Sequence, residues 1–376
     1  MTEITSLGEI AKVISGQSPP GSTYNDQGEG LPFFQGKAEF GLVSPNIKKW
    51  CSQPVKIAEA GDILISVRAP VGPTNLADQQ CCIGRGLAAI RPDTSKADRD
   101  YIHWALKWAE PKLIQKGQGS TFSAINRKDL QSIELPLPPL PEQRRIVDIL
   151  SRANGIRRLR REAQEKARQV IPALFVEMFG DPQRNPKGWP VDQLTNVAIF
   201  VGGSSLPDGE EFIGQADGTL LLKVSDLNLP GNETAVNKSK LWTGDQLSGQ
   251  FFCEAEAVVF PKRGAAIATN KKRLLMRDAA LDPNLMAVRP EPAKMDGIYL
   301  LSWFNSFDLA SIQSGTVVPQ INKRDLAPLT ISVPPVELQK AFGEKVSDIQ
   351  AMIAQQDRMA AASERLVQSL MAEVFG

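Results

Sequence analysis

Histidine and cysteine are scarce in this sequence of 376 residues. It contains 1 histidine and 4 cysteines, and no two cysteines have the Cys-x-x-Cys spacing of a zinc site. Three cysteines lie in the first half and only Cys253 lies in the second, which does not suit a disulfide framework. The sequence therefore predicts no metal site, no disulfide scaffold and a reducing, cytoplasmic location.

Catalytic motifs are missing as well. There is no Gly-x-x-x-x-Gly-Lys-Ser/Thr phosphate loop, no Gly-x-Ser-x-Gly nucleophile turn and no Asn/Asp-Pro-Pro-aromatic tetrapeptide for methylating a flipped base. No signal peptide and no apolar run of about 20 residues is present. The 43 Lys and Arg residues balance 42 Asp and Glu residues, which excludes a polyanion binder driven by overall charge. We predict a non-catalytic binding protein outside the membrane, with only local contacts to nucleic acid.

A long internal duplication is the main positive feature. Residues 125–130 (INRKDL) recur as residues 321–326 (INKRDL), 196 positions later (321 − 125 = 196). The same distance separates LFVEMFG at 174–180 from LMAEVFG at 370–376. Solenoid repeats have periods of about 20 to 50 residues, so this is a duplicated domain with a duplicated tail. We predict globular domains at 1–140 and 181–336 and helices at 141–180 and 337–376.

Each tail shows the heptad periodicity of a coiled coil. Apolar residues recur at spacings of three and four from Ile146 to Leu174, with Arg160 as the only interruption. Gln356 occupies the equivalent position in the second tail (356 − 160 = 196). Polar residues at the middle of both tails predict antiparallel helices, with Arg160 beside Gln356 to fix their register. The alternative is a helical hairpin packed on its own domain, but a whole domain separates the two helices in the sequence.

The globular halves predict an α+β class. Short segments rich in β-branched and apolar residues alternate with Gly, Pro and Asn turns, and one helix is expected near 99–116 and another near 295–314. The predicted fold is thus α+β, with two homologous globular domains separated by two long antiparallel coiled-coil helices and related by an approximate two-fold axis.

Basic and small polar residues gather in the predicted loops. Lys and Arg neutralise phosphates, while Gln, Asn and Arg can read base edges. A solvated turn is the alternative for each cluster, and a helix-start or interface role is the alternative for the equivalent pairs Arg127/Lys323 and Lys128/Arg324. The candidate DNA-binding residues are Gln35, Lys37, Arg68, Gln118, Ser120, Thr121, Arg127, Lys128, Lys223, Lys262, Arg263, Lys271, Lys272, Arg273, Thr316, Lys323 and Arg324.

The sequence PPLPEQ at 138–143, its counterpart PPVELQ at 334–339 and the two domain-plus-helix copies together resemble the specificity subunits of type I restriction-modification enzymes. The resemblance implies two target-recognition domains, each reading one half of a split, asymmetric site in double-stranded DNA, and helices that set the gap. It also implies two methylation subunits that use S-adenosylmethionine and restriction subunits that use ATP and Mg, with no cofactor bound by this chain.

One departure from the repeat lies in this proline-rich sequence. Glu142 and Glu337 are 195 positions apart (337 − 142 = 195), which weakens the expectation that the two subunit-docking surfaces are equivalent. A coiled-coil scaffold that binds only protein is the alternative function, and the near-zero net charge favours it. An enzyme with nuclease-associated activity is a third hypothesis, which the missing motifs disfavour.

Overall fold

The structure is a computed structural model that describes residues 3–117, 124–206, 210–211, 218–244, 247–315 and 318–376. The chain divides into two compact units. Unit 1 comprises residues 1–162 and 358–376, and unit 2 comprises residues 163–357. Each unit therefore contains one globular domain together with part of each long helix.

Unit 1 contains three sheets, which have the strand orders β1-β11, β2-β10-β7-β8 and β3-β5-β4-β9-β6. Its strands are β1 (Glu3–Ser6), β2 (Ala11–Ser15), β3 (Tyr24–Asn25), β4 (Leu31–Phe34), β5 (Trp50–Cys51), β6 (Ile57–Ala58), β7 (Ile63–Ser66), β8 (Thr74–Leu76), β9 (Cys81–Ile83), β10 (Leu87–Pro92) and β11 (Glu134–Leu137). Its shorter helices are α1 (Leu7–Ile10), α2 (Arg99–Gly117), α3 (Arg127–Gln131) and the 3₁₀ turns η1 (Gly21–Thr23) and η2 (Lys37–Glu39).

Unit 2 repeats this plan with the strand orders β12-β23, β13-β22-β19-β20-β16 and β14-β17-β15-β21-β18. Its strands are β12 (Val191–Gln193), β13 (Ala198–Gly202), β14 (Glu210–Glu211), β15 (Thr219–Leu222), β16 (Ala235–Val236), β17 (Leu241–Thr243), β18 (Phe252–Cys253), β19 (Val258–Pro261), β20 (Arg273–Leu275), β21 (Ala279–Leu281), β22 (Leu285–Pro290) and β23 (Thr330–Ser332). Its shorter helices are α5 (Leu194–Val197), α6 (Gly297–Phe304), α7 (Lys323–Leu326), η3 (Val224–Asn228), η4 (Gly264–Thr269) and η5 (Leu309–Ile312).

The central strands β7 and β19 are mostly apolar because they lie between two cores. Ile63 and Ile65 of β7 belong to the core that contains α2, whereas Leu64 points into a second core on the other face. Val258 of β19 packs with α6 in the same way, and Val259 belongs to the opposite core. A strand buried on both faces has no polar alternation, which is why these segments read as continuous apolar runs.

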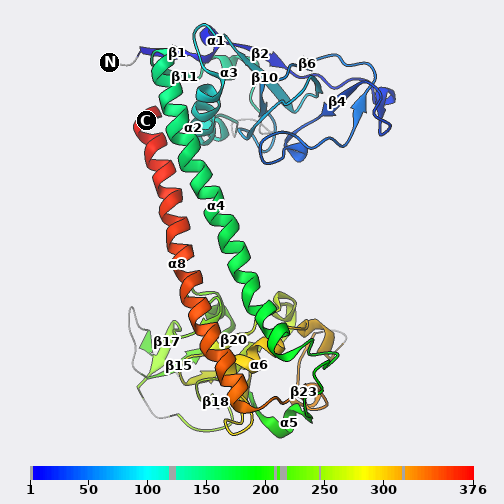
Figure 1. The fold of residues 1–376 in the computed structure, drawn as a ribbon, viewed down its shortest axis with the longest axis vertical. Coiled ribbons are helices and arrows are strands. Elements are labelled where there is room, and N and C mark those ends of the chain that lie inside the picture. Colours follow the sequence, from blue (N-terminus) through cyan, green and yellow to red (C-terminus); the bar gives the residue numbers. More distant parts are fainter. Residues whose placement is uncertain (1–2, 118–123, 207–209, 212–217, 245–246, 316–317) are drawn as a thin grey trace. The chain divides into compact units, whose positions relative to one another are not determined.

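Two helices of 40 residues each, α4 (Leu140–Phe179) and α8 (Val336–Phe375), pass through both units. In unit 1 the last turns of α8 lie alongside the first turns of α4, and Val367 shares a core with Leu150 (Figure 1). In unit 2 the last turns of α4 meet the first turns of α8, where the rings of Phe175 and Phe342 are 5.7 Å apart. The helices are antiparallel in each unit, as the duplication predicts.

Equivalent contacts are made at the helix ends in the two units. Phe375 at the end of α8 packs on Tyr101 of unit 1, with ring centroids 5.3 Å apart. Its equivalent, Phe179 at the end of α4 (375 − 179 = 196), packs on Tyr299 of unit 2 at 4.8 Å. Each helix therefore begins on its own domain and ends in the core of the other copy.

The predicted line of apolar contacts along the helices is wrong in its middle part. Ile149 and Ile156 are exposed, whereas the more protected positions are Arg157, Arg160 and Gln164. In unit 1 the Nη1 atom of Arg157 lies 2.9 Å from a carboxylate oxygen of Glu364 on α8. In unit 2 the side chain of Gln164 donates to Asp357. These contacts are polar, and several apolar residues of the heptad pattern are left exposed.

Two further expectations differ from the structure. The second-domain helix expected at 295–314 ends at Phe304, because Ser306 bonds back to the carbonyl of Trp303 through both its backbone N–H and its hydroxyl. Arg160, which was expected beside Gln356, forms its hydrogen bonds within unit 1. Its guanidinium donates to the carbonyl of Met359, at 2.8 Å, and to the hydroxyl of Ser363.

The four cysteines are buried and form no disulfide. None of the described helices is long and apolar enough to cross a membrane. Within the described ranges, no group of three or more His, Cys, Asp and Glu side chains could hold a metal ion.

Candidate nucleic-acid interface

Arg68 and Arg263 occupy the same place in the two units. Each follows a central strand by two residues: Ser66 of β7 pairs with Leu87, and Pro261 of β19 pairs with Leu285. Each arginine then forms an isolated β-bridge, Arg68 with Ala124 and Arg263 with Gln320. Because those bridges join the two repeated INxxDL-type segments to the sheet, the two arginines are structural equivalents.

The same backbone pairing fixes the repeated basic residues near these arginines. The N–H of Ile125 donates to the carbonyl of Val67 at 2.9 Å, and that of Ile321 donates to Lys262 at 2.8 Å. The next residue, Asn126 or Asn322, caps a short helix in a reciprocal capping box with the Asp three residues later. The first helical residues, Arg127 and Lys128 or Lys323 and Arg324, are exposed. The four basic residues thus stand at helix starts, as the alternative interpretation expected. The capping groups, however, are Asn and Asp, and the basic side chains face solvent.

Like charges gather closely in unit 2. A Cβ atom on Gly202, at the end of β13, would lie 3.5 Å from Nζ of Lys262 and 3.8 Å from Cε of Lys323. Burial lowers the pKa of Lys262, and the neighbouring cations Arg263 and Lys323 lower it further. The basic cluster of unit 2, formed by Lys262, Arg263 and Lys323, is therefore electropositive and favours an anion.

The basic cluster of unit 1 consists of Arg68, Arg127 and Lys128, all of which are exposed. Among the residues that the structure describes, no member of either cluster forms an ion pair. Arg324, beside the second cluster, lies 3.9 Å from Asp325. Exposed cations without carboxylate partners, repeated at one structural position, are suited to phosphate groups.

Three of the candidates serve the scaffold instead. Lys272 is 4% exposed, and its ammonium donates to the carbonyl of Phe307 at 2.6 Å. Arg273 donates to the carbonyls of Asn232 and Lys272 at 2.8 and 2.9 Å. The ammonium of Lys271 donates to the side chain of Asn228. The charged end of Lys272 is therefore buried and bonded to the backbone, so it does not face solvent.

The remaining candidates fall in two groups. Gln35, Lys37 and Lys223 are exposed at the equivalent turns η2 and η3, where Glu39 and Asp226 accept hydrogen bonds from the backbone of the residue that precedes the turn. Gln118, Ser120, Thr121 and Thr316 lie outside the described residues. They directly precede the Ile125 and Ile321 segments in the sequence.

The residues that the sequence argument missed are Gln143 and Gln339. Both are fully buried and join the start of a long helix to the loop before α2 or α6. Their equivalence at 196 positions (339 − 143 = 196) was the available signal. The equivalence of Arg68 and Arg263 was harder to see, because these arginines are 195 positions apart (263 − 68 = 195).

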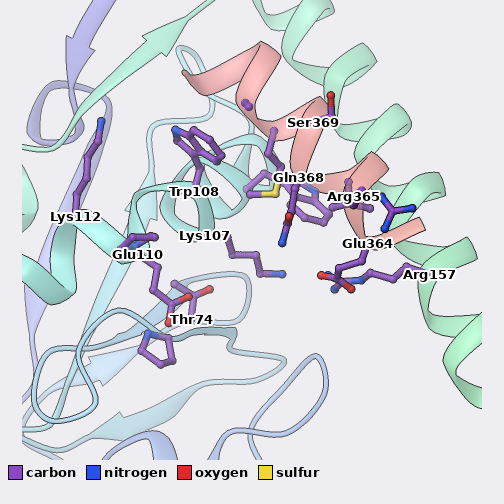
Figure 2. A pocket seen from close by; sticks show the side chains of 16 residues that line it. Thr74, Lys107, Trp108, Glu110, Lys112, Arg157, Glu364, Arg365, Gln368 and Ser369 are labelled. Carbon is purple, nitrogen blue, oxygen red and sulfur yellow. The ribbon is translucent and has the colours of Figure 1, made fainter. Parts of the chain in front are cut away.

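A groove of about 1090 Å³ lies on unit 1 between α2, the start of β8 and the two long helices (Figure 2). Lys107 extends from α2 toward Glu364 and Arg157, and its ammonium lies 4.7 Å from the ring centroid of Trp104. Burial and the charge of Arg157 lower the pKa of Lys107. In unit 2 the shorter α6 ends before the equivalent positions, where Asn305 and Ser306 stand. This groove is a feature of unit 1.

A family model for the type I restriction modification DNA specificity domain matches residues 2–166. A protein of Methanocaldococcus jannaschii described as the MjaX specificity subunit of a type I restriction enzyme is 46% identical over 179 residues, which cover 46% of this chain and 42% of that protein. The chain thus spans less than half the length of this relative. The MjaIX specificity subunit of the same organism is 23% identical, with 100% of this chain and 93% of that protein covered. The EcoDI specificity subunit of Escherichia coli is 26% identical, with 98% and 86% covered.

Solved structures show the same fold. The crystal structure of a type I restriction-modification S subunit from M. genitalium has a TM-score of 0.62 at 14% identity and covers 100% of this chain and 96% of that one. A chain from a study of complex assembly and conformational transition in the type I R-M system has a TM-score of 0.62 at 20% identity, with 99% and 97% covered. Residues 2–166 thus match the specificity domain of type I restriction-modification systems, and the chain as a whole is similar to specificity subunits of these systems.

Proposed function

We propose that this chain is the sequence-specific DNA-binding subunit of a type I restriction-modification complex. It reads a bipartite, asymmetric site in double-stranded DNA, with one half-site on each globular domain. It carries out no catalysis itself, and it directs methylation and restriction by partner subunits in the cytoplasm. The similarity to specificity subunits supports the class of protein, and the structure of each domain supports the DNA contact.

The observation that carries the proposal is the recurrence of the basic clusters. Arg68 and Arg263 occupy equivalent positions, and each is joined by the backbone to a repeated basic helix start. Two domains with the same phosphate-binding frame and different surrounding loops suit two different sequences, because phosphate contacts position a protein and base contacts specify the sequence. Net charge near zero is compatible with this function, since binding depends on the local clusters.

The long helices support the proposed control of half-site spacing. Each is continuous for 40 residues, which corresponds to a length of about 60 Å at 1.5 Å per residue. Both take part in both units through core contacts such as Phe179 with Tyr299 and Phe375 with Tyr101. A helix anchored at both ends has a fixed length, and we propose that this length sets the gap.

Exposed apolar stripes on the helices support the docking of partner subunits. Ile149, Ile156 and Val170 of α4 are exposed and lie seven or fourteen residues apart, and Met352, Met359 and Leu366 repeat the pattern on α8. Ile156 and Met352 are equivalent (352 − 156 = 196). A heptad stripe without a partner fits an apolar helix of another protein. We propose two methylation subunits here, which bring S-adenosylmethionine, and restriction subunits, which bring ATP and Mg.

Methylome sequencing tests this function. A strain that lacks other modification systems is supplied with this chain and its methylation subunits, and modified positions are mapped across the genome. The expected result is one asymmetric motif in two parts with a constant gap. A strain with the methylation subunits alone is the control and is expected to show no motif. If the full strain shows no bipartite motif, the protein-binding scaffold is favoured instead.

A further inference from the structure

The loop at residues 40–49, between η2 and β5, displays large apolar side chains to solvent. Leu42 is 81% exposed, Val43 is 61% exposed, and Ile47 is also exposed. Exposed apolar side chains that stand together in one loop mark a contact surface more often than scattered ones do. The question is what covers them.

Buried hydrogen bonds hold this loop in place on the central sheet. The side-chain amide of Asn75, which is 3% exposed on β8, donates to the carbonyl of Gly41 at 2.9 Å. The N–H of Leu76 donates to the carbonyl of Val43 at 3.1 Å, and that of Asn46 donates to Glu39 at 2.7 Å. The backbone on both sides of Leu42 is therefore fixed. A ligand that binds the exposed side chains loses little free energy to ordering of the loop.

Gly41 makes this close approach possible. A Cβ atom at this position would lie 2.4 Å from the carbonyl oxygen of Ser44, which the N–H of Gly41 already contacts. The turn therefore needs a glycine directly before Leu42. The conformation of the loop tip in unit 1 is therefore fixed by its hydrogen bonds and by Gly41.

The charge around the loop is positive. Residues 40–58 contain three lysines, Lys48, Lys49 and Lys56, and no acidic residue. Lys48 and Lys49 are exposed and form no ion pair with any described residue. The nearest acid in the sequence, Glu39, points inward, and its carboxylate accepts from the backbone of Gly36 at 2.9 Å and of Gln35 at 3.2 Å. An apolar tip beside free lysines fits a ligand that is anionic along its backbone and apolar at some of its edges.

The equivalent loop of unit 2 is different. Residues 229–240 lie between η3 and β17, as residues 40–49 lie between η2 and β5. The N–H of Met276 donates to the carbonyl of Val236, as that of Leu76 donates to the carbonyl of Val43, but Val236 is fully buried. Asn232 is fully buried and donates to the carbonyls of Asp226 and Lys238, both at 2.8 Å. The neighbouring Leu229 is half-buried. The two domains thus share the basic clusters but present different surfaces at this loop.

We infer that the loop at residues 40–49 is a sequence-reading element for one half-site, in which Leu42 and Val43 contact apolar base edges and Lys48 and Lys49 contact the flanking phosphates. The thymine methyl group is the apolar edge in the major groove. This inference rests on the proposed DNA-binding function and adds the residues that distinguish one half-site from the other. A loop that differs between two domains of the same plan is where such a distinction is expected.

The test uses the full complex of this chain with its methylation subunits and the bipartite site found by methylome sequencing. Binding is measured on the native site, on a site with the first half-site substituted and on a site with the second half-site substituted. The variant is Leu42→Ser with Val43→Ser. Because both side chains are exposed, we expect the variant to fold. The control is Ile4→Ser, which removes a side chain of the same unit that is 60% exposed on β1.

The expected result is a loss of about tenfold to a hundredfold in affinity for the native site, in the range of a mismatched base pair. Preference for the correct sequence at one half-site falls by the same factor, preference at the other half-site is unchanged, and Ile4→Ser behaves as wild type. A second variant, Leu42→Met with Val43→Ile, keeps apolar contact and is expected to retain most of the preference. Replacing Lys48 and Lys49 by Ala weakens binding to all sequences equally.

Two results overturn the inference. One is an unchanged preference at both half-sites in the serine variant. The other is a serine variant that no longer assembles with the methylation subunits while its remaining complex keeps the wild-type preference, which identifies the loop as a protein contact. Failure of the proposed function is separate, because it appears as wild-type protein that binds all DNA sequences equally.

Discussion

Gln143 and Gln339 make the same three hydrogen bonds in different units. The amide of Gln143 donates to the carbonyls of Lys96 and Pro138, and its oxygen accepts from the N–H of Asp98. Gln339 makes the equivalent bonds in unit 2. Its amide donates to the carbonyls of Lys294 and Pro334, and its oxygen accepts from the N–H of Asp296. The glutamine that ends each proline-rich helix start is therefore a clamp between the first turn of a long helix and its domain.

Replacing Gln143 by Ala is predicted to destabilise unit 1 by about 2 to 4 kcal/mol, because two buried carbonyls and one N–H lose their partners. Gln339→Ala is predicted to have a similar effect on unit 2. The measurement is urea unfolding followed by circular dichroism. Gln80→Ala is the control, because Gln80 is exposed and bonds only to Glu59 at the surface. A change below about 0.5 kcal/mol at Gln143 is incompatible with the clamp.

Substituting Arg68 or Arg263 by Ala is predicted to weaken DNA binding at all sequences and to reduce the salt dependence. One lost phosphate contact lowers the slope of log K against log salt by about 0.9. The two substitutions are expected to have similar effects, since the residues occupy equivalent positions. Arg152→Ala, which removes an exposed arginine paired with Asp148 on α4, is the matched control. Unaltered slopes for both variants count against the basic clusters as phosphate sites.

Lys272 gives a prediction of pH dependence. Burial lowers its pKa to about 8, from an ordinary value of 10.5. Below pH 8 the buried ammonium is charged and reduces stability. Between pH 8 and 10.5 the folded protein releases this proton before the unfolded chain does, so the free energy of unfolding rises with pH.

The size of this rise is bounded by the shift of the pKa and is about 1 to 3 kcal/mol. The free energy of unfolding is measured by urea denaturation at pH 8 and pH 10 for wild type and for Lys272→Met. Other lysines and tyrosines titrate in both proteins, so the difference between the two proteins isolates the contribution of Lys272. The variant is expected to lack the rise. Parallel curves for the two proteins contradict the assignment.

Adding one heptad to both α4 and α8 at equivalent positions is predicted to lengthen each helix by about 10 Å. The gap between the half-sites is expected to grow by about three base pairs, while the half-site sequences stay unchanged. Methylome sequencing provides the measurement. A heptad in α4 alone is the control and is expected to disturb the antiparallel pairing and lower methylation. New half-site sequences with an unchanged gap mean that the helices do not set the spacing.

The sequence predicted the plan of the fold because the duplication is a global signal. Identical spacing of 196 positions between repeated blocks required two domains and two equivalent helices. The face of the helices was not predictable. Ile149 and Ile156 have the heptad spacing of a core, yet Arg157 and Gln164 lie in the contact. Hydrophobicity alone does not distinguish residues that face this chain's own helix from residues that face another protein.

The candidate site was predictable only where it is part of the repeat. Arg127 and Lys323 were identified as equivalents from the sequence, and both are exposed helix starts. The run Lys271 to Arg273 looked like a basic loop, but β20 begins there, and Lys272 reaches a backbone carbonyl that lies 35 positions away in the sequence. Such a distant partner leaves no local signal.

The exchange of helix ends between the two copies also has a consequence for synthesis of the chain. Val367 and Phe375 belong to the core of unit 1, although they leave the ribosome only after the whole second domain. Domains usually fold in order from the N-terminus as they emerge. Here the second unit can complete its core first, since its own residues run from 163 to 357. The core of unit 1 is finished only once Val367 and Phe375 have been made, so a nascent polypeptide stalled before Val367 leaves this core incomplete.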